Sequence, residues 1–266
     1  MPSAPNPAAP RAPWWESYFS AQYGALYRGP LAPELSTEDD VETVARLFSG
    51  SAAPVLDVGC GYGRHLDRAR RAGVPAVGLE YSAALLNLLP RRARKAAIRG
   101  DMRSLPFAGG ALGGAWMLFN TFGYFDDAEN EGVLAGLARV LAPGARLLMD
   151  APARSAMVAT VRDVPSVIRM QERVSIQENW TIDSTGKRLN SAGQWVLGGV
   201  VQTWAMSLRL YTPAELERLL RRAGFAGEIE IRPLEELTAL GTGDPAPKTT
   251  DALWRRTTNM AVLAAR

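Results

Sequence analysis

Cysteine and histidine are nearly absent from this 266-residue chain. Its single cysteine is Cys60, and its single histidine is His65. A single cysteine excludes an internal disulfide and fits a reducing compartment, so we expect a cytoplasmic protein. One histidine and one cysteine also exclude a zinc site built from these two ligand types. A magnesium or calcium site made of carboxylates alone stays open.

Long apolar runs are absent as well. No stretch approaches the roughly 18 residues of a membrane-spanning helix, and the first residues lack the pattern of a secretory signal. We therefore expect no membrane contact. Lysine is scarce among the 30 basic residues, which arginine dominates, and 27 acidic residues leave a net charge of +3. We interpret the arginine clusters at 64–71 and 91–95 as solvated helix faces and expect no nucleic-acid partner.

The beginning of the chain has two parts. Residues 1–13 carry five prolines among small residues, which predicts a flexible tail. The next segment, 14–50, predicts a helical lid over a binding site, with a second helix at 37–48 capped by Ser36 or Thr37. Packing of the same helices on a sheet edge is the alternative. Aromatic residues near helical spacing support both readings: Trp14, Trp15, Tyr18, Phe19, Tyr23 and Tyr27.

From residue 53, strand and helix patterns alternate. Strands are predicted at 54–58, 76–80, 96–99, 115–119 and 145–150, with helices at 63–72, 82–93 and 127–140. Such repeated units predict a Rossmann-like, doubly wound α/β fold whose sheet is mainly parallel.

The alternation of strand and helix patterns ends in the second half of the chain. Several β segments with turn signals between them predict an antiparallel β insertion at about 165–210. A helix then begins after Thr212 and ends at Gly224. Strands at 228–233 and 257–265 complete a seven-stranded sheet, the last of them as an antiparallel edge. We thus expect one domain over 51–266 that contains the insertion.

The most informative segment runs from Val55 to Gly63, where a buried strand leads into three glycines at alternate positions and then a helix. Glycines allow a tight turn and close approach of a ligand, and a helix N-terminus offers free amides. Glu80 ends the next strand, where a carboxylate can accept both hydroxyls of a ribose. Asp101 follows the third strand and is suited to accept an adenine amino proton.

These three features together resemble the class I S-adenosylmethionine-dependent methyltransferases, whose first motif is similar to the segment Asp57–Gly63. The resemblance covers about residues 50–266 and implies S-adenosylmethionine as cofactor and S-adenosylhomocysteine as product. It also implies that Glu80 holds the ribose, that Asp101 and Met102 hold the adenine, and that the glycine loop lies against the methionine part. The residues assigned to the cofactor are Asp57, Gly59, Cys60, Gly61, Gly63, Glu80, Tyr81, Asp101, Met102, Phe119 and Tyr23.

Within that family, the segment 118–125 is similar to enzymes that act on small molecules, because it lacks the Asn/Asp-Pro-Pro-Tyr/Phe motif of many nucleic-acid and protein methyltransferases. We predict direct in-line transfer of the methyl group to a nitrogen, oxygen or carbon atom, with catalysis by proximity and orientation. Candidate catalytic residues are Asn120, Tyr124 and His65. Candidate residues for binding the acceptor are Trp15, Tyr18, Tyr27, Arg154, Arg209 and Tyr211.

Other functions stay open at this point. The chain could methylate RNA or protein, or bind the cofactor without methyl transfer. A nicotinamide-dependent oxidoreductase is disfavoured, because Tyr62 and Arg64 break the Gly-x-Gly-x-x-Gly spacing. The acceptor we expect is a small molecule, and the assembly a monomer or a homodimer.

Overall fold

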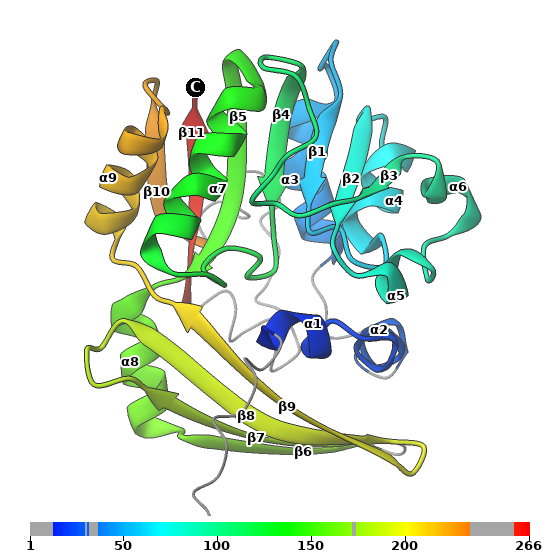
Figure 1. Cartoon of the computed structure of the whole chain (residues 1–266), viewed down its shortest axis with the longest axis vertical. Coiled ribbons are helices and arrows are strands. Elements are labelled where there is room, and N and C mark those ends of the chain that lie inside the picture. The colour runs from blue at the N-terminus through cyan, green and yellow to red at the C-terminus, as the bar shows by residue number, and fades with distance from the viewer. Residues whose placement is uncertain (1–12, 30, 32–36, 172–173, 235–257) are drawn as a thin grey trace, which may run out of the picture.

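The computed structural model describes residues 13–29, 31, 37–171, 174–234 and 258–266. Of the predicted tail, only Pro13 is among the described residues. Ser36, one of the two predicted cap residues, lies outside them. The described strands form two sheets, shown in Figure 1. The larger is seven-stranded, in the order β10-β11-β5-β4-β1-β2-β3. Its strands are β1 (Val55–Val58), β2 (Ala76–Glu80), β3 (Ala97–Arg99), β4 (Leu112–Met117), β5 (Leu141–Pro152), β10 (Ile229–Pro233) and β11 (Asn259–Ala265).

The strands β1 to β5 are parallel, as the repeated strand–helix pattern predicts. The predicted antiparallel edge is wrong: β11 is antiparallel but lies between β5 and β10, and β10 forms the edge. The composition of the two strands explains this order. Apart from Asn259, β11 is apolar and almost wholly buried, whereas β10 carries Glu230, Arg232 and Pro233, which suit an edge strand.

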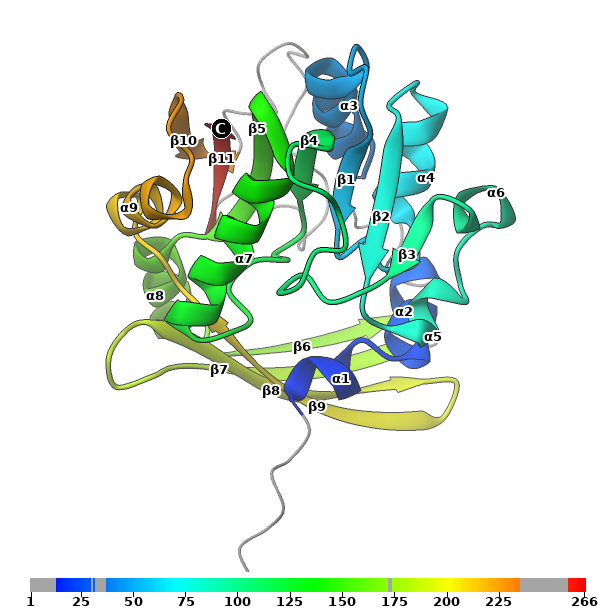
Figure 2. The same ribbon diagram turned by 45° about the horizontal axis from the view of Figure 1, so that its top comes forward.

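Helices cover both faces of the large sheet (Figures 1 and 2). Side chains alternate across each strand, so Leu56 and Leu147 enter the core on one face and Val55 and Leu148 the core on the other. The first core is closed by α7 (Asp127–Val140) and α9 (Pro213–Ala223), and the second by α3 (Thr37–Phe48) and α4 (Arg64–Arg71). This two-sided burial confirms the doubly wound α/β fold.

Some helices follow the prediction and others do not. The α9 helix begins at a capping box in which Thr212 and Glu215 satisfy each other's backbone N–H groups, as predicted. The predicted helix at 82–93 is wrong: it consists of α5 (Ala83–Leu86) and α6 (Arg91–Arg94). Pro90 separates them, because a proline disfavours helical conformation in the residue before it. The helix α8 (Arg154–Asp163) was not predicted.

The smaller sheet is the predicted antiparallel insertion. Its strands are β6 (Ser166–Gln171), β7 (Val174–Ile182), β8 (Arg188–Leu197) and β9 (Val200–Arg209), paired in chain order. Two short helices, α1 (Trp14–Tyr18) and α2 (Ala21–Arg28), lie between this sheet and the large one (Figure 2). Leu26 packs with Ile176 and Trp204 of the insertion, so the N-terminal helices are fixed to the smaller sheet.

Within the described residues, no helix is both long enough and apolar enough to cross a membrane.

Candidate functional site

The glycine loop joins the end of β1 to the start of α4. Gly59, Gly61 and Gly63 all have left-handed backbone conformations, with φ of 70°, 56° and 84°. A Cβ atom on Gly59 would lie 2.7 Å from the methyl group of Thr121, so the loop passes too close to that residue for any side chain. The N–H groups of Gly59 and Cys60 both donate to the carbonyl of Leu79, which holds the loop against the end of β2. The spacing of the glycines is therefore a requirement of the backbone.

Glu80 lies beside this loop, at the end of β2. Its Oε2 accepts the N–H of Gly61 at 2.8 Å, and its Oε1 accepts the N–H of Ser82 at 2.7 Å. Burial raises the pKa of Glu80 above its ordinary value, although these backbone donors oppose the shift. Each carboxylate oxygen has a further lone pair, so the same group is able to accept two ligand hydroxyls.

Asp101 follows β3 and is partly exposed. Its carboxylate pairs with Arg103 at 2.7 Å, and burial, which raises its pKa, is outweighed by the hydrogen bonds and charge of Arg103, so the pKa is lowered. The same guanidinium pairs with Glu129 at 2.7 Å and lies over the rings of Phe125 and Trp15, at 4.8 and 5.6 Å. Arg103 thus connects the end of β3 to α1.

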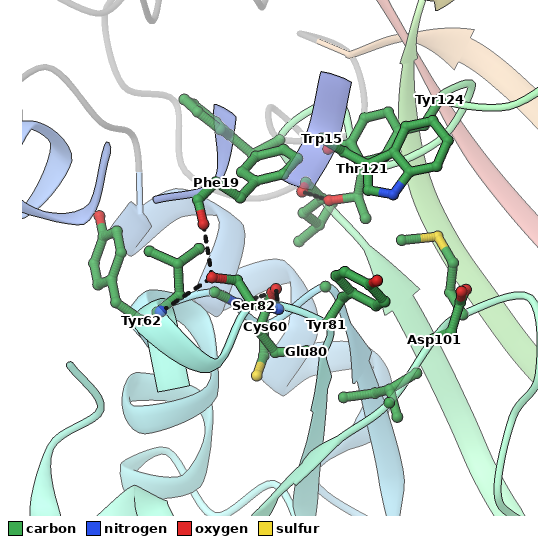
Figure 3. A pocket seen from close by; sticks show the side chains of 18 of the residues that line it. Trp15, Phe19, Cys60, Tyr62, Glu80, Tyr81, Ser82, Asp101, Thr121 and Tyr124 are labelled. Atoms are coloured by element: carbon green, nitrogen blue, oxygen red, sulfur yellow. Dashed lines mark hydrogen bonds between the residues drawn. The ribbon is translucent and has the colours of Figure 1, made fainter. Parts of the chain in front are cut away.

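These groups surround a cavity at the carboxyl ends of β1 to β4, here called the cofactor cavity. Figure 3 shows Trp15 and Phe19 of the N-terminal segment across the cavity from Glu80. The predicted residues that line it are Gly59, Cys60, Gly61, Glu80, Tyr81, Asp101, Met102, Phe119 and Tyr23. Residues that the sequence analysis did not assign to it include Phe19, Tyr62, Ser82, Leu85, Thr121 and Phe125.

Residues of the cofactor cavity hold the N-terminal helices in place. Ser82 donates a hydrogen bond of 2.6 Å to the carbonyl of Phe19, and Tyr62 donates one of 3.0 Å to the carbonyl of Tyr27. Tyr81 donates to the carboxylate of Glu16 at 2.8 Å. The position of α1 and α2 is therefore coupled to the residues that line the cavity.

A second cavity of about 310 Å³, here called the acceptor cavity, lies between the N-terminal helices and the smaller sheet. Four aromatic residues line both cavities: Phe19, Tyr23, Phe119 and Tyr124. The other aromatic residues of the acceptor cavity are Trp14, Tyr18, Tyr27 and Trp180. Its aliphatic residues are Val164, Val167, Leu189, Met206 and Leu208, and its polar ones are Asn120, Thr160 and Glu178.

The two cavities meet at an unusual turn after β4. Phe119 and Asn120 have φ of 64° and 59°, and no other non-glycine residue in the described part of the chain has a positive φ. Such conformations are costly and persist where surrounding contacts impose them. The Asn120 N–H donates to Asp150 at 3.3 Å, and its side-chain oxygen accepts a hydrogen bond of 2.7 Å from Asn259. These partners hold Asn120 at the wall of the acceptor cavity.

The other two candidate catalytic residues lie in different surroundings. Tyr124 lines both cavities, and burial, reinforced by the charge of Glu80, raises the pKa of its phenol far above the ordinary value. The phenol therefore stays protonated at neutral pH. His65 lines the cofactor cavity but is buried, and its Nε2 lies 3.0 Å from the carboxylate of Asp40 in α3.

Asp57 and Gly63, which the sequence analysis assigned to the cofactor, do not line the cofactor cavity. Asp57 is buried in the sheet at the end of β1, and burial raises its pKa to about 7. Gly63 caps α4, where a Cβ would lie 2.2 Å from Leu89. Asp57 therefore belongs to the strand before the loop, and Gly63 to the start of the helix after it. Cys60 lines the cavity, and burial raises the pKa of its thiol, so it has little thiolate character.

The residues proposed to bind the acceptor separate into two groups. Tyr18 and Tyr27 line the acceptor cavity, and Trp15 lines the cofactor cavity. The structure places the other three elsewhere, because each is held by a neighbour. Arg154 pairs with Glu215, Arg209 pairs with Asp127 at 2.7 Å, and Tyr211 stacks on Phe122 with ring centroids 5.5 Å apart. None of these three lines either cavity.

Four polar residues were not predicted from the sequence: Thr160 and Glu178 line the acceptor cavity, and Asp150 and Asn259 hold Asn120. Asp150 and Asn259 are distant from Asn120 in sequence, and only the pairing of β5 with β11 brings them together. Glu178 had a detectable signal, since it lies between Ile176 and Trp180 on the apolar side of an alternating strand.

Comparison with known proteins agrees with this architecture. Residues 55–144 match the family described as a methyltransferase domain. A curated relative, dTDP-3-amino-3,4,6-trideoxy-alpha-D-glucopyranose N,N-dimethyltransferase from Streptomyces venezuelae, is 28% identical over 130 residues, which are 48% of this chain and 54% of the relative. The match therefore spans about half the length of that relative.

Two solved structures share the fold. The CcbJ methyltransferase from Streptomyces caelestis has a TM-score of 0.71 at 19% identity, covering 94% of this chain and 98% of that chain. The S-adenosylmethionine-bound CalS10, an amino pentose methyltransferase from Micromonospora echinaspora involved in calicheamicin biosynthesis, has a TM-score of 0.60 at 21% identity, covering 92% and 97%.

The matched domain begins at β1 and contains the glycine loop, Glu80 and Asp101, which the large sheet brings together around the cofactor cavity. Residues 55–144 therefore form a methyltransferase domain, and S-adenosylmethionine is its cofactor.

Proposed function

We propose that this chain transfers the methyl group of S-adenosylmethionine to a nitrogen, oxygen or carbon atom of a small molecule held in the acceptor cavity. The observation that carries this proposal is the wall of four aromatic residues that the two cavities share. A molecule in the acceptor cavity lies directly next to the cofactor cavity. The name of the curated relative, which is a dTDP-amino-sugar N,N-dimethyltransferase, supports a small-molecule acceptor.

The residues of the cofactor cavity fit the cofactor. The absence of a side chain at Gly59 and Gly61 leaves the loop backbone exposed to the methionine part of the ligand. We assign the ribose hydroxyls to the two carboxylate oxygens of Glu80, and the adenine to Asp101 and the neighbouring Met102. Tyr81, which follows Glu80 in the sequence, also lines the cavity, and we assign it to the nucleoside part of the cofactor.

The bound cofactor supplies an electrophilic methyl group on a positively charged sulfur. The chain's own contribution is to orient the acceptor and to exclude water, and proximity of this kind lowers a barrier by about 7–11 kcal/mol. Aromatic rings attract positive charge, and Tyr23 and Tyr124 line both cavities where they meet. Because the phenol of Tyr124 stays protonated, we assign it a hydrogen-bonding role rather than that of a base.

Two alternatives make different predictions. A cavity of about 310 Å³ between the N-terminal helices and the smaller sheet favours a small acceptor over a folded RNA or protein. Affinity for RNA that falls steeply with added salt would favour the macromolecular alternative. A homologue that binds the cofactor without methyl transfer would bind it and yet methylate no acceptor in a broad panel.

The test of the proposal is calorimetric titration with S-adenosylmethionine and S-adenosylhomocysteine, followed by assay of methyl transfer to a panel of small acceptors. Glu80→Ala and Asp101→Ala should both abolish measurable cofactor binding. Glu217→Ala, which removes an exposed carboxylate of α9, is the matched control and should bind normally. Absence of binding by the wild-type protein would overturn the proposal.

A further inference from the structure

The acceptor cavity combines aromatic walls with one acidic side chain. Half of the described residues that line it are aromatic, and five more are aliphatic. Among the described lining residues, Glu178 is the charged one, and none is Arg, Lys or His. The lining therefore offers an anionic acceptor no cationic partner, whereas a cation meets both a carboxylate and several ring faces.

The position of Glu178 breaks the pattern of its own strand. Along β7, Val174, Ile176 and Trp180 are buried on the inner face, while Gln177 and Asn179 point outward and are exposed. Glu178 lies on the inner face, where alternation calls for a hydrophobic side chain. A residue that breaks a local rule of this kind is expected at a functional site.

Glu178 is also held in a defined position. The hydroxyl of Ser191, on the neighbouring strand β8, donates a hydrogen bond of 2.5 Å to its Oε1, and Ser191 is itself only 2% exposed. Tyr18 of α1 lines the same cavity. Burial raises the pKa of its phenol, and the neighbouring tyrosines and the charge of Glu178 add to the shift, so this ring stays neutral. The carboxylate thus shares the cavity with an uncharged tyrosine.

We infer that the acceptor is a small molecule with an apolar body and a basic amine, whose protonated form is bound by Glu178 and the surrounding aromatic rings. This inference rests on the proposed function, since it names the class of molecule that occupies the acceptor cavity. Glu178 is a residue that determines which acceptor binds. It acts with Trp180, its neighbour on the inner face of the strand, whose ring lines the same cavity.

The experiment measures binding of three probes of similar shape to protein saturated with S-adenosylhomocysteine. The probes are cyclohexylamine, cyclohexanol and cyclohexanecarboxylate. Their binding is measured by the quenching of tryptophan fluorescence, because Trp14 and Trp180 line the cavity. The amine should bind about tenfold or more tightly than the alcohol, and the carboxylate most weakly. Glu178→Gln should weaken amine binding about tenfold, as expected for loss of a charged hydrogen-bond partner, and leave alcohol binding unchanged.

Two controls separate this inference from the proposed function. Glu217→Gln makes the same chemical change on an exposed face of α9 and should leave amine binding unchanged. Calorimetric binding of S-adenosylhomocysteine by Glu178→Gln should equal that of the wild type, which shows that the fold and the cofactor cavity are intact. The inference is overturned if the amine shows no saturable quenching, if the alcohol or carboxylate binds as tightly, or if Glu178→Gln binds the amine normally. Loss of cofactor binding by the wild type would instead overturn the proposed function.

Discussion

The side-chain amide of Asn259 donates a hydrogen bond of 2.7 Å to the side-chain oxygen of Asn120, across 139 residues of sequence. The same amide donates to Asp150 at 2.8 Å, and Asp150 in turn accepts the backbone N–H of Asn120. Asp150 and Asn259 are 0% and 3% exposed. Asp150 of β5 and Asn259 of β11 thus hold Asn120, which has a left-handed backbone conformation, at the wall of the acceptor cavity.

Replacing Asn259 should disturb this turn. Asn259→Ala leaves an oxygen of the buried Asp150 and the side-chain oxygen of the half-buried Asn120 without this donor, which should lower the free energy of unfolding by about 1–3 kcal/mol in urea titrations. Methyl transfer should fall while binding of S-adenosylhomocysteine changes little, because the cofactor cavity does not contain Asn259. Asn179→Ala, on the exposed side of β7, is the control. Equal stability of the two variants would contradict the role assigned to Asn259.

Substitution of two glycines that have the same φ distinguishes the cost of backbone strain from the cost of a steric clash. Gly59 and Gly110 both have φ of 70°, but a Cβ on Gly59 would meet Thr121 at 2.7 Å, whereas one on Gly110 meets nothing within 4 Å. Gly110→Ala should therefore cost about 1–2 kcal/mol of stability and leave cofactor binding unchanged. Gly59→Ala should cost more and abolish binding in calorimetry. Normal cofactor binding by Gly59→Ala would show that the loop has room for a side chain.

Arg103 should control how firmly α1 covers the cofactor cavity. Arg103→Ala removes the ion pairs with Asp101 and Glu129 and the contact with the ring of Trp15. Hydrogen exchange of the amides at 14–18 should become about two- to fivefold faster, which corresponds to roughly 0.5–1 kcal/mol for an exposed cation–ring contact. Arg222→Ala, which removes another arginine paired with a glutamate, should leave these amides unchanged. Unchanged exchange in Arg103→Ala would show that other contacts hold α1.

The sequence predicted those parts of the fold whose signals are local. The capping box at Thr212 and the glycines after β1 are each defined within a few residues, and both are found as expected. The order of β10 and β11 depends on long-range pairing, which no local pattern encodes. The α8 helix was missed for a physical reason: Ala153, at its N-cap, makes no side-chain capping bond, so the sequence carries no start signal.

The same distinction holds for the candidate site. Glu80 and Asp101 were predictable because successive parallel strands end at one edge of the sheet, and both line the cofactor cavity. Arg209 was assigned to the acceptor from strand alternation alone. Its partner, Asp127, begins a helix 82 residues earlier, and their ion pair keeps the guanidinium away from both cavities. Polar side chains with strong distant partners therefore limit what a single sequence reveals.

Asp57 should make the stability of the protein depend on pH. Burial raises its pKa from 3.8 to about 7, so the folded state favours the protonated carboxyl. An acid whose pKa is raised by folding stabilises the folded state fully below its unfolded pKa, and this contribution is lost as the pH rises through the folded pKa. The wild type should therefore lose stability between about pH 4 and pH 7.

The variant Asp57→Asn resembles the protonated acid at every pH and should not lose this contribution. Its free energy of unfolding, relative to the wild type, should rise by up to about 4 kcal/mol between pH 4 and pH 8 in urea titrations. Asp67→Asn is a control with the opposite pH dependence, because the hydrogen bond from Arg92 lowers the pKa of Asp67. Removal of the Asp67 carboxylate should therefore cost stability at neutral pH rather than in acid. Parallel pH profiles for Asp57→Asn and the wild type would show that the Asp57 carboxyl is not destabilised when ionised, and that the end of β1 tolerates a buried charge behind the glycine loop.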